Sequence, residues 1–158
     1  MKNNLYKTLV AILFLLSSTS VFAQGGDSLM TYDLATQAMD SAETYAREQG
    51  WNVTILITDQ NNNVVMVRRL DGAGARTWDF ATAKALAVNE TGLSSGEYGT
   101  RREAGTIEEV EGGVTFAGGV PVFVNGQRIG AIATSGVQAS QDEEVSIAGA
   151  EAIGSASN

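Results

Sequence analysis

Few side chains in this sequence can do acid–base or binding chemistry, because it contains no histidine and no cysteine. Lys84 is the one charge in a run of small and apolar residues, 81–88. Its ammonium group either reaches the rim of a buried helix face or lines a pocket for an acidic ligand. Asp71 opens a glycine-rich loop, where a carboxylate acts as a general base or shapes an Asp-Gly turn. Both interpretations of each residue stay open.

A second group consists of Tyr98 and the two arginines that follow it, Arg101 and Arg102, in an irregular stretch rich in Gly, Ser, Glu and Arg. In an acidic protein, these residues suit the carboxylates of a bound ligand. Surface ion pairs with Glu103 or Glu108 are the simpler explanation of the two arginines.

Arg69 is a further binding candidate, next to Arg68 at the end of an expected strand. Neighbours on a strand point to opposite faces, so the two arginines cannot form one clamp. Arg69 is the stronger candidate because the loop that contains Asp71 follows it closely.

The glycine pair Gly118-Gly119 precedes Val120 and Pro121. Two glycines permit close approach of the backbone to a ligand, or an unusual bend where a strand begins, and both interpretations can hold. Pro121 lacks a backbone N–H and predicts an edge position in the sheet. Asp142 is explained fully as a charge near the start of a helix, so we expect no catalytic role for it.

The elements that must position these residues are clearest at the C-terminal end. Asn125-Gly126 lies between the apolar runs 120–124 and 129–133, which predicts a tight β-hairpin because both turn residues tolerate positive φ. Ser140 and Glu143 have the spacing of a capping box, which predicts a helix from there to about residue 153.

Upstream, the pattern predicts a helix capped by Thr31 and ending at Gly50, then strands at 51–58 and 64–69. A helix follows from residue 78 to about 90, with Thr77 before it, and then at most one helical turn near 94–98. Both faces of the first two strands are apolar, so helices should cover the sheet on each side. The order predicts an α+β sandwich built on an antiparallel sheet.

The first residues predict export. Lys2 and Lys7 precede a short apolar run, 9–16, and Val21-Phe22-Ala23 provides small residues at the cleavage positions. The run is too short to span a membrane. We therefore expect residues 1–23 to be a signal peptide and residues 24–158 to form a single periplasmic or secreted domain, with no membrane insertion after cleavage.

Composition restricts the partners of that domain. The net charge of −8 disfavours nucleic acid and anionic lipid surfaces as partners. The absence of histidine and cysteine argues against a zinc or copper site of ordinary composition, and it also excludes a Ser-His-Asp or Cys-His catalytic set.

Several of these segments also carry a family resemblance. Gly118-Gly119-x-Pro121, the hairpin segment 125–132 (NGQRIGAI) and the QDE of 141–143 resemble the C-terminal signature of the GlcG/HbpS-like family. This is the haem-binding or "haem-degrading" domain, also fused to some cobalamin adenosyltransferases. Upstream, the Leu70 to Ala73 segment and Lys84-Ala85 are similar to further family segments in the same order, so the resemblance covers about 32–153.

The resemblance implies a sheet of about five antiparallel strands flanked by helices, a homo-oligomer, and haem as the candidate cofactor. It places a planar acidic ligand between the helix of 78–90 and the Gly118-Gly119 hairpin. The ligand-binding residues expected on this basis are Arg69, Lys84, Thr91, Ser95, Tyr98, Arg101, Gly118 and Gly119. Tyr98 is the expected iron ligand if the ligand is haem, and Thr91, Ser95 and Met66 are the alternatives.

Three functions remain as alternatives at this stage. The first is an exported protein that binds haem or a related planar acidic molecule. The second is an enzyme on the same scaffold, acting on a small compound outside the cytoplasm by acid–base chemistry through Asp71 or Lys84. The third is a partner-binding module without a small ligand.

Overall fold

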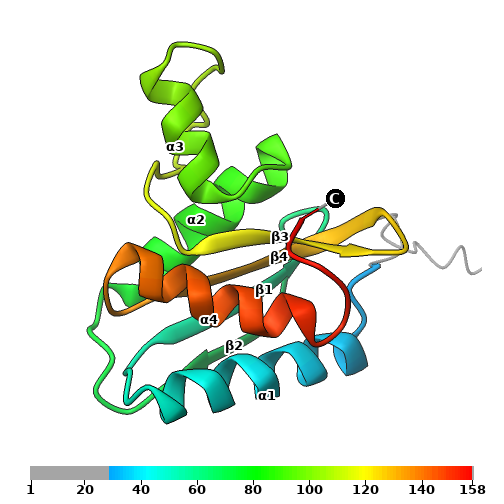
Figure 1. Cartoon of the computed structure of the whole chain (residues 1–158), viewed down its shortest axis with the longest axis vertical. Coiled ribbons are helices and arrows are strands. Elements are labelled where there is room, and N and C mark those ends of the chain that lie inside the picture. Colours follow the sequence, from blue (N-terminus) through cyan, green and yellow to red (C-terminus); the bar gives the residue numbers. More distant parts are fainter. Residues whose placement is uncertain (1–28, 158) are drawn as a thin grey trace, which may run out of the picture.

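The computed structural model describes residues 29–157, which form a four-stranded antiparallel sheet with helices on both faces (Figure 1). The sheet order is β2-β1-β4-β3. This confirms the α+β class, although the described residues contain four strands where about five were expected. The expected signal peptide, residues 1–23, lies outside the described residues. The elements are α1 (Tyr32–Glu48), β1 (Thr54–Asp59), β2 (Val64–Arg69), α2 (Thr77–Thr91), α3 (Ser95–Glu103), β3 (Gly119–Val124), β4 (Gln127–Ser135) and α4 (Ala139–Glu151).

Alternate residues of β1 enter two separate cores, one on each face of the sheet. Ile55 and Ile57 belong to the larger core, on the side that α1 and α4 cover. Leu56 points the other way and packs with Ala81 and Ala85 of α2. This arrangement confirms the prediction, made from the apolar character of both strand faces, that helices cover each side of the sheet.

The C-terminal hairpin has the predicted turn. Asn125 and Gly126 have φ values of 51° and 76°, the two positive angles that a two-residue hairpin turn of this kind requires. Pro121 lies on β3, an edge strand, as predicted. The outward N–H groups of this edge are largely occupied, because Gly119 donates to Ser95 Oγ at 2.9 Å and Phe123 donates to the Ser155 carbonyl at 2.9 Å. The edge of β3 is therefore protected against pairing with another strand.

Helix starts were predicted less well than turns. Thr31 caps α1 as expected, accepting a hydrogen bond from the Leu34 N–H at 3.2 Å. The predicted capping box at Ser140 was wrong: α4 starts at Ala139, and Gln138 is its N-cap in a capping box with Gln141. Thr77, which we expected to precede α2, is its first residue.

The helix α3 is the main departure from prediction. It runs for nine residues and is capped by Ser94, where the sequence predicted at most one turn. Its two glycines lower helix propensity, but Gly99 lies so close to the backbone that a Cβ there would be 1.9 Å from the Thr115 carbonyl oxygen. Together with residues 104–117, α3 projects from the sandwich (Figure 1). Within residues 29–157, no helix is long and apolar enough to cross a membrane.

Candidate functional site

Lys84 forms an ion pair in the interior of the protein. Its side chain is completely buried, and Nζ donates to Asp142 Oδ2 at 2.8 Å and to the Thr134 carbonyl at 2.8 Å. Nζ also lies 5.2 Å from the centroid of the Phe116 ring. Lys84 therefore neither snorkels to a rim nor faces an open pocket, and it ties α2 to β4 and α4.

Asp142 is the partner that sequence reasoning missed. Its Oδ1 accepts from the Val137 N–H at 3.1 Å, while Oδ2 accepts from Lys84 Nζ. A charge at the start of α4 seemed sufficient to explain this carboxylate. The signal that could have found it is Lys84 itself, since a lone lysine in a buried apolar helix needs a buried acid close by.

Burial shifts the pKa values of this pair in opposite directions. Desolvation lowers the pKa of Lys84 and raises that of Asp142, while their mutual hydrogen bond opposes both shifts. Glu143 also has a raised pKa because of burial, opposed by a hydrogen bond with Ser94 and by the charge of Lys84. The site thus concentrates titratable groups whose charged forms are costly, and the ring of Phe116 lies over the ammonium group.

The glycine pair is required by this ion pair. Gly118 has φ of +125°, and a Cβ there would lie 2.3 Å from Lys84 Nζ. A Cβ on Gly119 would lie 3.0 Å from Lys84 Cβ. The Gly118 carbonyl accepts from Ser146 Oγ at 2.7 Å, and the buried Ser95 accepts from Gly119. In this structure the close approach permitted by the two glycines is to protein groups.

Tyr98 is buried as well, with 1% of its surface exposed. Its phenol oxygen accepts from the Val110 N–H at 2.9 Å, so it anchors the loop after α3. Its role as an iron ligand stays a prediction. The alternatives are also engaged: Thr91 donates to the Ala87 carbonyl at 2.6 Å, and Met66 packs against the larger core.

The arginines of α3 pair with acids, although with different ones from those expected. Arg101 is exposed and donates to Glu97 at 2.8 Å, one turn earlier on α3. Arg102 donates to the Ile107 carbonyl at 3.1 Å and lies 3.4 Å from Glu109. The predicted partners Glu103 and Glu108 were wrong, because the unexpected length of α3 brings Glu97 under Arg101.

An open hollow of about 500 Å³ lies between α3 and the segment that leads to β3. Its walls carry a cation, an acid, hydroxyl groups and two positions without side chains. Lys84, Tyr98 and Gly119, from which a pocket was predicted, are buried, and this hollow is lined instead by neighbours of Tyr98 on α3. We call this feature the α3 hollow; its lining residues are Gly96, Gly99, Thr100, Arg102, Glu103 and Thr115.

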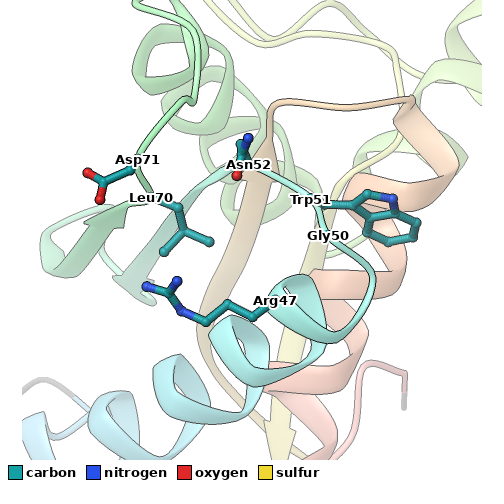
Figure 2. Close-up of a pocket in the computed structure, with 6 residues that line it drawn as sticks. All are labelled: Arg47, Gly50, Trp51, Asn52, Leu70 and Asp71. Atoms are coloured by element: carbon teal, nitrogen blue, oxygen red, sulfur yellow. The ribbon is translucent and has the colours of Figure 1, made fainter.

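Asp71 lines a different and smaller hollow, of about 230 Å³, between the end of α1 and the end of β2 (Figure 2). Lys84 is not among the residues that line it. Arg69 donates to the Ala73 carbonyl, while Arg68 pairs with Asp40 on α1, so the adjacent arginines do point to different faces. Asp71 and Lys84 therefore do not form one acid–base site.

Fold and site together describe an α+β domain with a buried polar centre and two open, charged hollows. The chain matches the family described as "Haem degrading protein HbpS-like" over residues 30–151. This protein belongs to the HbpS-like family. No curated protein matches it significantly.

Solved structures agree with this assignment. A double mutant of HbpS from Streptomyces reticuli is 31% identical, with a TM-score of 0.72, over 78% of this chain and 86% of that one. The protein ORFY from Klebsiella pneumoniae is 24% identical, with a TM-score of 0.71, over 77% and 88%. PduOC, solved as a complex with haem, is 20% identical, with a TM-score of 0.69, over 81% and 98%. The last two similarities show the fold alone.

Proposed function

We propose that this protein binds haem, or a related planar acidic molecule, in the α3 hollow. The observation that carries the proposal is an open cavity with an arginine in its wall, in a domain of a family described as haem-degrading. Its volume of about 500 Å³ falls within the range of ordinary ligand pockets.

The walls of the α3 hollow suit an acidic ligand. Gly96 and Gly99 let α3 pack closely against Ala117 and Thr115, so the hollow has one wall from α3 and one from the segment before β3. Arg102 is half-buried, and its guanidinium group, which donates to the Ile107 carbonyl, would exchange its 3.4 Å contact with the exposed Glu109 for a ligand carboxylate such as a propionate. Arg102 is the cation among the lining residues, and Glu103 is the acid.

The residues present fit the acidic edge of haem better than its iron. Axial ligands are usually His, Cys, Met or Tyr, and this chain lacks the first two. Within residues 29–157, no group of three or more acidic residues could hold a metal ion. The α3 hollow itself offers oxygen atoms, from Thr100, Glu103 and Thr115. When bound, haem would supply redox-active iron, and Arg102 would hold the haem through its propionate carboxylates.

A haemin titration followed by absorption tests the proposal. We expect a saturable shift of the absorption band for the purified protein. Arg102→Gln should weaken the affinity by about tenfold, the effect of losing a charged hydrogen bond. Arg76→Gln is the control, because Arg76 is an exposed arginine at the N-cap of α2 and does not line the α3 hollow.

Tyr98→Phe tests the iron ligand separately, since a phenolate ligand gives a high-spin ferric spectrum that the variant would lose. A wild-type protein without any saturable shift would remove haem from consideration. A shift that Tyr98→Phe leaves unchanged would keep haem and exclude Tyr98 as its ligand.

An enzyme acting on the same ligand is the second candidate, favoured by the family's description as haem-degrading. After binding, a slow loss of the haemin band in the wild type, absent from Arg102→Gln at equal occupancy, would support it. A stable complex would favour simple binding.

Export and self-association complete the proposal. The charged start, short apolar run and Val21-Phe22-Ala23 support cleavage after Ala23. Mass spectrometry of the exported protein should find Gln24 as its first residue, and retention of residues 1–23 would contradict this. Sedimentation should find a homo-oligomer, and a monomer at all concentrations would contradict that part of the proposal.

A further inference from the structure

The hollow beside Asp71 has its own charge pattern, separate from the α3 hollow. It lies where the last turn of α1, the approach to β1 and the end of β2 meet, and it is lined by Arg47, Gly50, Trp51, Asn52, Leu70 and Asp71 (Figure 2). We propose that this hollow binds a small zwitterion of the α-amino-acid class, whose carboxylate contacts Arg47 and whose ammonium group contacts Asp71.

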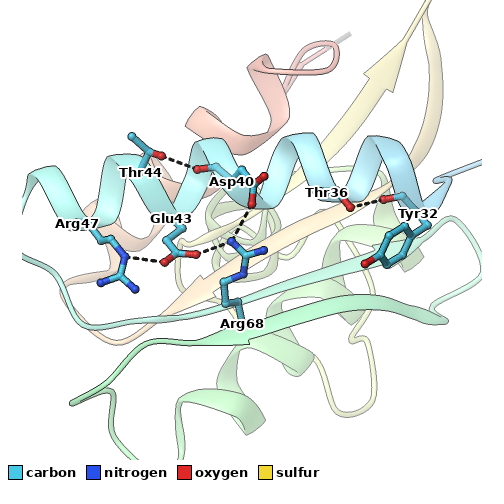
Figure 3. A network of polar contacts seen from close by, with 7 residues as sticks. All are labelled: Tyr32, Thr36, Asp40, Glu43, Thr44, Arg47 and Arg68. Carbon is cyan, nitrogen blue, oxygen red and sulfur yellow. Dashed lines mark hydrogen bonds and ion pairs between the residues drawn. The ribbon is translucent and has the colours of Figure 1, made fainter.

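Arg47 is held so that one edge of its guanidinium group stays available. Its Nε donates to Glu43 Oε1 at 2.6 Å, and Glu43 is itself held by Arg68, which also donates to Asp40 at 2.8 Å (Figure 3). Neither Nη atom of Arg47 has a partner among residues 29–157. These two atoms form the fork that binds a carboxylate with two parallel hydrogen bonds.

Asp71 provides the opposite charge at the same hollow. Its side chain is exposed, and within the described part of the chain its carboxylate makes no hydrogen bond or ion pair, either with Arg47 or with another residue. Arg47 and Asp71 carry charges of opposite sign, line one hollow and do not pair with each other, so they are complementary to a ligand that carries both signs.

The size and the charges of the hollow favour a zwitterion over larger ligands and over ligands with a single charge. A volume of about 230 Å³ is small for a drug-sized ligand and adequate for an amino acid. A simple carboxylate would meet Asp71 and a simple amine would meet Arg47, each with repulsion. Leu70, only 4% exposed, gives the hollow an apolar floor for a small side chain.

Nuclear magnetic resonance of the purified protein tests this assignment, with L-alanine as the probe and propionate and ethylamine as single-charge comparisons. We expect saturable shifts of the Gly50, Asn52 and Asp71 amide signals with L-alanine, and at least about tenfold weaker binding of the other two. Arg47→Gln and Asp71→Asn should each weaken L-alanine binding by a similar factor.

Arg101→Gln is the matched control, because Arg101 also donates Nε to a glutamate one turn earlier, at 2.8 Å, but does not line this hollow. The affinity of the Arg101→Gln variant for L-alanine should equal that of the wild type. The proposal is overturned if L-alanine causes no saturable shift, if propionate or ethylamine binds equally well, or if Arg47→Gln leaves the affinity unchanged. The haemin titration does not depend on these outcomes, since the two hollows share no residue.

Discussion

Two ion-pair systems in this protein have the same contact distance and opposite surroundings. Lys84 Nζ lies 2.8 Å from Asp142, and Arg68 Nη1 lies 2.8 Å from Asp40. The side chains of the first pair are 0% and 4% exposed, whereas those of the second are 37% and 61% exposed. Distance alone therefore says little about what an ion pair contributes, because solvent decides both its cost and its strength.

The buried pair is supported by its surroundings in a way that the exposed one is not. Thr134 accepts from Lys84, and Val137 donates to Asp142, so each charge has a second partner. Gly118 leaves the space that the pair occupies. The exposed system needs no such support, because water solvates whatever hydrogen-bonding capacity its members leave unused.

The largest expected effect comes from removing one member of the buried pair. Lys84→Met should lower the free energy of unfolding by about 3 to 5 kcal/mol, because it leaves Asp142 buried without its counter-charge. The double variant Lys84→Met with Asp142→Asn should lose much less than the sum of the two single losses, since no unpaired charge remains. Urea unfolding at neutral pH measures the losses of Lys84→Met, Asp142→Asn and the double variant.

Additive losses in that double-mutant cycle would mean that the two charges act independently. A Lys84→Met loss below about 1 kcal/mol would place the buried pair in the same energetic class as a surface pair, and the contrast between the two systems would disappear.

The exposed system should respond weakly and in a salt-dependent way. Arg68→Gln removes two ion pairs at once, with Asp40 and Glu43, but we expect a loss of only about 1 kcal/mol or less. This loss should shrink in about 1 M salt, where screening is strong. The Lys84→Met loss, measured in parallel as a control, should keep its size. A salt-independent loss for Arg68→Gln would contradict the distinction.

The sequence predicted what depends on neighbours along the chain. Asn125-Gly126 requires positive φ wherever it lies between two strands, and Thr31 caps a helix by contacts within one turn. Sequence patterns missed what depends on contacts between segments far apart along the chain. The contact of Gly99 with Thr115 supports α3, and no local pattern reports it.

The candidate sites divide in the same way. Residue types directed attention to Asp71 and to the arginines near Tyr98, and both regions do contain hollows. The pairing of Lys84 with Asp142 joins residues 58 positions apart, so it could be found only once the fold had shown which helices and strands lie together. Arg47 was overlooked because an arginine on an amphipathic helix is typical of a solvated face.

The smallest expected effects are on the pH dependence of stability. The contributions of Glu43 and Glu143 to stability should change in opposite directions as the pH rises. Hydrogen bonds from Arg68 and Arg47 lower the pKa of Glu43 below its ordinary value of 4.5, so its stabilising effect is present above pH 4.5 and is lost as the pH falls through the lowered pKa. Burial, opposed by Ser94 and Lys84, raises the pKa of Glu143 above 4.5, so its contribution is present below pH 4.5 and is lost as the pH rises through the raised pKa.

Relative to wild type, Glu43→Gln should be less stable at neutral pH, with the deficit closing in acid. Glu143→Gln should gain relative stability as the pH rises from acid to neutral. Urea midpoints of the two matched variants across this range measure both trends, and slopes of the same sign would show that burial does not govern Glu143.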